Sequence, residues 1–102
     1  MRIVILKEDS TVGVDGEFRS QLDFSSCGVP ENFWAFQWGE RGQERGHIEY
    51  DTSEVPNDVV TSIPGWALAC VAKLQEKLDQ EEAARIAAQE AAAAQQQPDQ
   101  PE

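Results

Sequence analysis

The chain has 102 residues with 19 acidic and 8 basic side chains, which gives a formal net charge of −11. Such a length allows one small domain with an extension, and such a charge argues against binding the phosphates of nucleic acids or anionic membranes. No apolar run approaches the roughly 20 residues of a membrane span, and Glu8 lies too close to the N-terminus for a secretion signal. We therefore expect a protein made in a cytoplasm, with no nucleic-acid partner and no membrane partner.

Residues 1–63 predict a small antiparallel β-domain, because β-branched and aromatic residues alternate there with turn residues. Residues 3–6 form a β-branched run that is typical of a strand covered on both faces. Residues 11–14 predict a second strand, and Asp15-Gly16 predicts a tight turn into a third strand over residues 17–24. The segment 25–32 carries a glycine and a proline and predicts a loop.

Residues 33–38 form the most aromatic segment and predict a strand. Strict alternation along that strand separates two sets of side chains, which are Phe33, Ala35 and Gln37 on one face and Trp34, Phe36 and Trp38 on the other. The second set is either core that a helix covers, or a surface that binds a partner or stacks on sugars. Stacking on nucleic-acid bases is not expected, because basic side chains do not flank the segment.

A polar loop over residues 39–46 leads to a return strand over residues 47–50, and residues 51–62 predict an irregular crossing segment. The loop is rich in glycine, but a strand rather than a helix follows it, so it does not match a phosphate-binding loop. His47, the single histidine, has no nucleophile or metal-ligand pattern around it. We therefore predict no catalytic residues, no metal site and no cofactor, and we do not expect an enzyme.

Residues 64–94 predict one long helix, with Thr61 or Ser62 as its N-cap and Pro64 in its first turn. The predicted helix carries an apolar stripe, and four residues of this stripe have the 4-3-4 spacing of a two-heptad coiled-coil seam. The stripe consists of Trp66, Ala67, Cys70, Val71, Leu74 and Leu78, and the seam consists of Ala67, Val71, Leu74 and Leu78. Two heptads are marginal alone, so we expect the seam to dock on its own β-domain or on another protein.

The seam ends after Leu78, because Glu81, Glu82 and Arg85 occupy the positions where it would continue. We expect Glu81 and Arg85 to form an i,i+4 ion pair on the helix surface. Residues 95–102 predict a flexible tail, because glutamine, proline and acidic residues dominate them. The predicted fold class is therefore α+β, with a small antiparallel β-domain followed by a long C-terminal α-helix.

The two cysteines, Cys27 and Cys70, set no disulfide framework. They can pair with each other, bridge to another chain or stay as free buried thiols, and a reducing cytoplasm favours free thiols. Cys70 lies between Ala69 and Val71 on the predicted apolar stripe, so we interpret it as part of the core.

The order of motifs in the β-rich part resembles small proteins encoded in the tail and tail-fibre gene clusters of tailed bacteriophages. The resemblance covers about half of the chain and rests on a valine-aspartate-glycine turn, a proline loop, an Ala-x-Gln-Trp strand and a Gly-x-Ile-Glu-Tyr return strand. The segments that carry it are residues 11–16, 22–25, 29–32, 33–38 and 46–50. Trp34 departs from the smaller residue or histidine expected before Ala35.

This resemblance implies a structural protein of the phage tail, located in the virion and made in the bacterial host cytoplasm, that binds a tail-fibre or baseplate protein. It carries no catalytic residues. A homo-oligomer through the helix is also expected, with a trimer favoured because tail fibres are trimeric. Two alternatives stay open, namely a tail-fibre assembly chaperone and an acidic inhibitor of a host nucleic-acid-binding defence protein. The predicted partner-binding residues are Trp34, Phe36, Trp38, Trp66, Ala67, Val71, Leu74 and Leu78.

Overall fold

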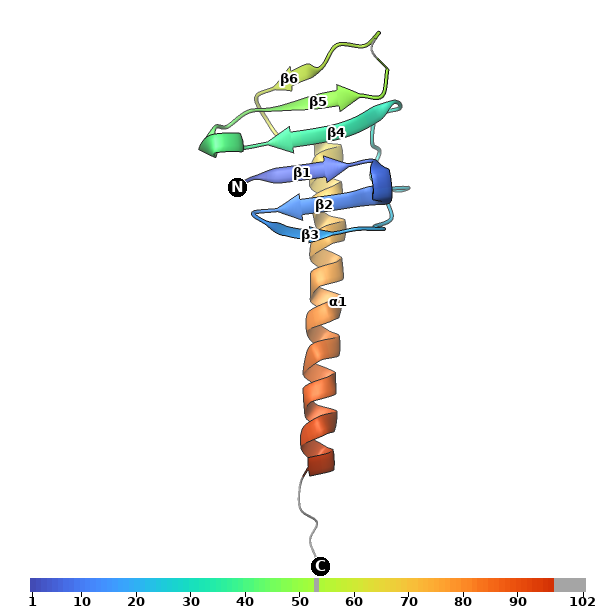
Figure 1. Cartoon of the computed structure of the whole chain (residues 1–102), viewed down its shortest axis with the longest axis vertical. Helices are drawn as coiled ribbons and strands as arrows, with labels where there is room; N and C mark the ends of the chain where they lie inside the picture. Colours follow the sequence, from blue (N-terminus) through green and yellow to red (C-terminus); the bar gives the residue numbers. More distant parts are fainter. Residues whose placement is uncertain (53, 97–102) are drawn as a thin grey trace, which may run out of the picture.

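The computed structural model describes residues 1–52 and 54–96 of the chain. It shows a six-stranded antiparallel sheet in the order β3-β2-β1-β4-β5-β6, with the long helix α1 across one face (Figure 1). The predicted α+β class is therefore confirmed. The elements are β1 (Ile3–Leu6), β2 (Thr11–Val14), β3 (Glu17–Arg19), β4 (Phe33–Trp38), β5 (Gly46–Tyr50), β6 (Asp58–Val60) and α1 (Gly65–Gln96), with short 3-10 turns η1 (Glu8–Ser10) and η2 (Glu40–Gly42).

The core lies on the face of the sheet that α1 covers. On the central strand β1, Ile3 and Ile5 are fully buried, whereas Val4 is half-buried and Leu6 is exposed. Ile5 lies between Val12 of β2 and Phe36 of β4, so three strands contribute to one apolar layer. The prediction that residues 3–6 are covered on both faces is wrong, because α1 packs against one face and the other is left open (Figure 1).

A β-bulge interrupts the alternation at the start of β4. The pairing with β5 shifts register between Phe33 and Ala35. Phe33 is consequently only 1% exposed, on the same side as Phe36, whereas Trp34 is 44% exposed. The prediction that Trp34 shares a face with Phe36 and Trp38 is therefore wrong, since strict alternation does not allow for an extra residue in the strand.

The strand boundaries also differ from expectation on both sides of the sheet. The predicted third strand over residues 17–24 ends at Arg19, and Gln21 then adopts a left-handed backbone with φ of 60°. The amide of Gln21 donates to the carbonyl of Asp9 at 2.6 Å, so this turn is tied to η1. The segment 51–62, predicted to be irregular, contains the edge strand β6, which pairs only with β5.

Helix α1 begins three residues after Ser62, so neither Thr61 nor Ser62 is its N-cap. The carbonyl of Pro64 instead accepts the amides of Ala67 and Leu68, at 3.0 and 3.1 Å. The helix extends to Gln96, two residues beyond the predicted end. The predicted tail 95–102 therefore starts inside α1, and its residues 97–102 lie outside the described part of the chain.

Candidate partner-binding surfaces

The predicted helix stripe packs against the sheet of its own chain. Ala67, Cys70 and Leu74 are almost fully buried in the same core as Ile3 and Ile5. Trp66, Val71 and Leu78 are partly buried and pack against that core. The seam therefore docks on its own β-domain, which is one of the two arrangements that its short length predicted.

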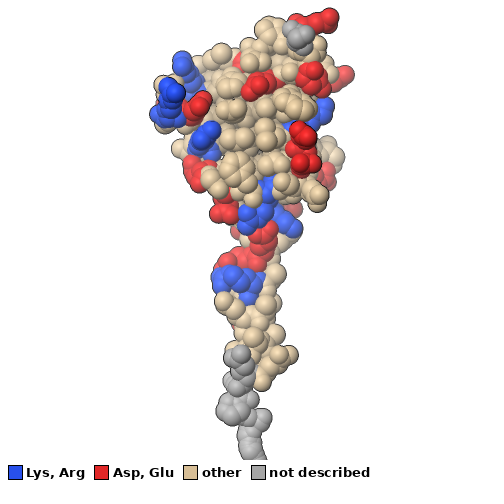
Figure 2. Space-filling model, viewed as in Figure 1, with Lys and Arg blue, Asp and Glu red and all other residues tan. Residues whose placement is uncertain are grey.

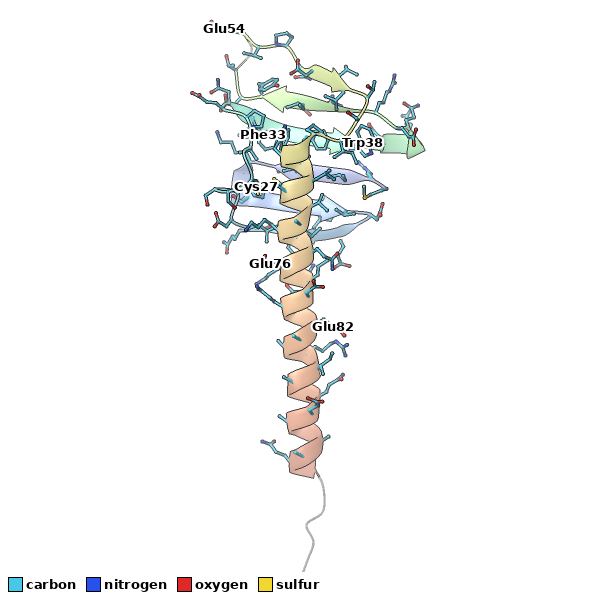
Figure 3. The ribbon with its side chains drawn as sticks, turned by 180° about the vertical axis from the view of Figure 1, so that it is seen from behind. Cys27, Phe33, Trp38, Glu54, Glu76 and Glu82 are labelled. Carbon is cyan, nitrogen blue, oxygen red and sulfur yellow. The ribbon has the colours of Figure 1, made fainter. Side chains whose placement is uncertain are left out.

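The structure brings the aromatic strand and the helix stripe together. The ring of Trp66 meets the ring of Phe33 edge-on at 5.0 Å between centroids and that of Phe36 at 5.4 Å. Figure 3 shows Phe33 and Trp38 on the sheet face that α1 covers. Edge-to-face pairs of this kind add about 0.5–1.5 kcal/mol beyond the burial of their area. Phe36, Trp38 and most of the stripe therefore form the interface between sheet and helix.

Trp34 is the member of the predicted partner-binding set that faces solvent. It lies at the edge of an open hollow of about 660 Å³ that Tyr50, Val55 and Pro56 also line. The hydroxyl of Tyr50 donates to Asp58 at 2.6 Å, and this hydrogen bond raises the pKa of Tyr50. Asp51, Thr52 and Asn57 complete the lining, so the hollow is of mixed polarity. An exposed tryptophan beside such a hollow is a feature of protein-binding surfaces, where aromatic anchors contribute most of the affinity.

An ion pair marks the point where α1 passes beyond the sheet. The guanidinium of Arg19 on the edge strand β3 donates to both carboxylate oxygens of Glu81, at distances from 2.6 to 2.9 Å. Arg19 also contacts Glu17 at 3.0 Å. The hydrogen bonds from Arg19 hold the pKa of Glu81 below its ordinary value, and those to Glu81 and Glu17 raise the pKa of Arg19. The predicted Glu81–Arg85 pair is therefore wrong, because Glu81 contacts the sheet and Arg85 pairs with Glu82 instead.

Beyond Glu81, the helix stands clear of the sheet. Every residue from Glu82 to Gln95 is exposed, including Ile86, and Glu82 lies on the part of α1 below β3 (Figure 3). Residues 83–95 carry one basic side chain, Arg85, and one acidic side chain, Glu90, so they are neutral in a chain of net charge −11. Figure 2 shows this lower part of the helix as mostly uncharged surface. We call residues 83–95 the projecting segment.

Both cysteines are free and buried in the core. Burial raises the pKa of the Cys70 thiol to about 12, with the neighbouring Cys27 as a second cause. A thiol with so high a pKa stays protonated at neutral pH and is a poor nucleophile. The interpretation of Cys70 as part of the core is confirmed, and in this structure Cys27 is also a free thiol.

The described residues hold no cluster of three or more metal-ligating side chains. His47 follows Gly46 at the start of β5, and its Nε2 lies 3.2 Å from the carboxylate of Glu49. Within residues 1–52 and 54–96, no helix combines the length and the apolar character needed to cross a membrane. No protein-family model, curated protein or solved structure matches the chain.

Proposed function

We propose that this chain is a structural protein of a bacteriophage tail, which binds a tail-fibre or baseplate protein through the projecting segment of α1. The motif order that resembles phage tail proteins suggests the setting. The observation that carries the binding role is the projecting segment itself, a stretch of continuous helix whose residues are all exposed within the described part of the chain.

The composition of the projecting segment fits a docking role. Eight of its residues are alanine, which has the highest helix propensity, so the segment stays helical without tertiary contacts. It continues from the packed part of α1, so the costly nucleation of a helix is not repeated. Small side chains allow another helix to approach closely, and a neutral surface avoids the repulsion that the rest of an acidic chain would impose.

The packing of the seam changes where copies of the chain could associate. Because Ala67, Leu74 and their neighbours are buried against the sheet, a trimer through that seam would require the helix to leave its own domain. We therefore place any association of copies, and the contact with a fibre or baseplate protein, on the projecting segment, with exposed Trp34 as a second contact.

Mass spectrometry of purified virions of the phage that encodes the chain tests this proposal. We expect the wild-type protein in the particles at a fixed ratio to the fibre or baseplate proteins. The variant Ala87→Asp, in the projecting segment, should be lost from the particles. The matched variant Ala72→Asp, at an exposed position of the packed half, should be retained.

Absence of the wild-type protein from virions would overturn the structural role. If the protein then co-purifies with unassembled fibres from infected cells, it is the assembly chaperone instead. On the face shown in Figure 2, acidic and basic side chains are scattered over uncharged surface and do not form a continuous acidic surface. This arrangement does not favour an acidic inhibitor that mimics DNA.

A further inference from the structure

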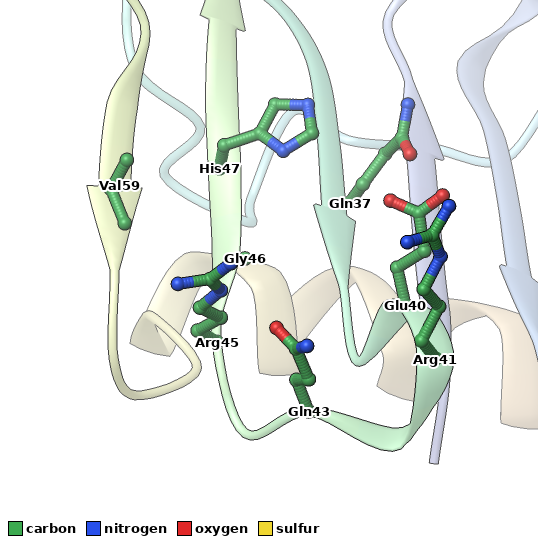
Figure 4. Close-up of a pocket in the computed structure, with 8 residues that line it drawn as sticks. All are labelled: Gln37, Glu40, Arg41, Gln43, Arg45, Gly46, His47 and Val59. Carbon is green, nitrogen blue, oxygen red and sulfur yellow. The ribbon is translucent and has the colours of Figure 1, made fainter.

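A polar hollow lies at one end of the sheet, on the face opposite α1. It has a volume of about 460 Å³ and lies between η2, the loop after it and the strands β4, β5 and β6. Figure 4 shows its side chains standing in front of the strands while α1 runs behind them. Its polar lining consists of Gln37, Glu40, Arg41, Gln43, Arg45 and His47.

Basic side chains outnumber acidic ones in the lining of this hollow, and the carboxylate of Glu49 lies 3.2 Å from His47 beside it. Two of the chain's 8 basic residues, Arg41 and Arg45, line it together with the single histidine, and Glu40 is the one acidic residue among the lining side chains. Within the described part of the chain, Lys7, Arg19 and Arg85 each have a carboxylate within 4 Å, whereas Arg41 and Arg45, like Arg2, Lys73 and Lys77, have none. The hollow thus holds two arginines that form no ion pair with the described residues, beside one lining carboxylate, that of Glu40.

The backbone that carries these side chains forms a constrained turn. Gly39 and Gly42 have φ values of 76° and 75°, and Arg41 between them has φ of 60°, which residues with a side chain rarely adopt. Gly39 also lies so close to the carbonyl of Met1 that a Cβ atom would be 2.1 Å from that oxygen. The amide of Gly39 donates to the carbonyl of Arg45 at 3.0 Å, which closes the loop.

We propose that this hollow binds a glutamate or aspartate side chain of an acidic protein segment. A planar guanidinium donates two parallel hydrogen bonds to a carboxylate, and the amides of Gln37 and Gln43 add donors beside it. Val59, which is 70% exposed, forms an apolar wall of the same hollow, so the fitting segment carries an apolar residue next to its acid. A polyphosphate fits less well, because it has no apolar group to place against Val59.

This surface is separate from the projecting segment and does not depend on the phage assignment. The test titrates the full chain, labelled with 15N, with the blocked peptide acetyl-Glu-Val-Glu-amide and follows the backbone amides and the arginine side chains by NMR. We expect saturable shifts confined to residues 37–47 and Val59. The double variant Arg41→Gln/Arg45→Gln should bind at least about tenfold more weakly.

The control variant Lys73→Gln/Lys77→Gln removes the same net charge from α1, outside the projecting segment, and should bind as the wild type does. If the control variant bound the peptide as weakly as the double arginine variant does, the peptide would be attracted only by the overall charge, and the proposal would be overturned. Binding of acetyl-Gln-Val-Gln-amide with the same affinity as the acidic peptide would overturn it as well. Saturable shifts with inorganic phosphate and none with the peptide would overturn the assignment to a protein segment. The spectra of each variant report directly whether it is folded.

Discussion

The two halves of α1 are one continuous helix, but they are helical for different reasons. Residues 65–81 bury Ala67, Cys70 and Leu74 against the sheet, and Arg19 binds the last turn of this half through Glu81. Residues 82–95, the projecting half, bury no side chain within the described part of the chain and consist mainly of alanine. Packing of an apolar face stabilises the first half, whereas intrinsic propensity maintains the second. A helix that continues past its own domain without contacts is therefore a candidate for contacts with another molecule.

Removal of an apolar side chain should have the largest effect in the packed half. Leu74 is 2% exposed, so Leu74→Ala should lower the free energy of unfolding by about 2–5 kcal/mol through lost burial and a new cavity. Ile86 is 43% exposed in the projecting half, so Ile86→Ala should change that free energy by at most about 0.5 kcal/mol. Urea denaturation of both variants measures the difference. Equal losses would mean that the projecting half packs on its own chain in solution.

Proline distinguishes the two halves through the backbone rather than through packing. Ala72 is exposed, yet Ala72→Pro breaks a helix that holds core residues in place. This variant should therefore lower the free energy of unfolding by about 3 kcal/mol or more. Ala88→Pro should remove helical circular dichroism while the unfolding midpoint of the β-domain stays the same. If Ala88→Pro lowered the unfolding midpoint as much as Ala72→Pro does, the division of α1 into two halves would be contradicted.

The ion pair at the boundary should have a smaller effect. Glu81→Gln removes the charge that Arg19 contacts, and because the pair is partly solvated we expect the Tm to fall by at most about 5 °C. Glu82→Gln, which breaks the pair with Arg85 inside the projecting half, should leave the Tm unchanged. Scanning calorimetry measures both. If Glu82→Gln lowered the Tm more than Glu81→Gln does, the boundary between the packed and the projecting half of α1 would lie elsewhere.

The smallest expected effect is a pH dependence at the same ion pair. Arg19 holds the pKa of Glu81 below its ordinary value, so the folded state favours the charged form. The resulting stability is present above the unfolded pKa of about 4.5 and is lost as the pH falls through the lower folded pKa. The stability of Glu81→Gln should therefore fall less steeply between neutral pH and acid pH than that of the wild type. If the stability of the wild type and that of Glu81→Gln fell equally with pH, Glu81 would not be the source of this pH dependence.

The hydrophobic patterns predicted several elements well. The β-branched run at residues 3–6 and the aromatic run at residues 33–38 have the composition of strands, and the 4-3-4 spacing in α1 has the period of a helix. The loss of that spacing after Leu78 also marks where the helix leaves the sheet. These features depend on side chains close in sequence, so they can be recognised without knowledge of the fold.

Other features depend on contacts between distant segments. The bulge that moves Phe33 into the core requires the register with β5. The strand β6 forms because β5 offers a free edge. Arg19 and Glu81 are 62 positions apart, and local spacing instead suggested Arg85 as the partner of Glu81. The hollow around Arg41 and Arg45 likewise depends on how η2 and the loop after it are placed at the ends of β4 and β5.

Residue patterns alone predict that a β-rich domain precedes a long helix, where the apolar stripe of that helix ends, and that Cys70 belongs to the core. The folded chain adds that the stripe packs on its own sheet, so that Trp34 and the projecting segment face solvent while Phe36 and Trp38 do not. An apolar pattern specifies that a face must be buried, but the geometry of the whole chain selects which surface covers it.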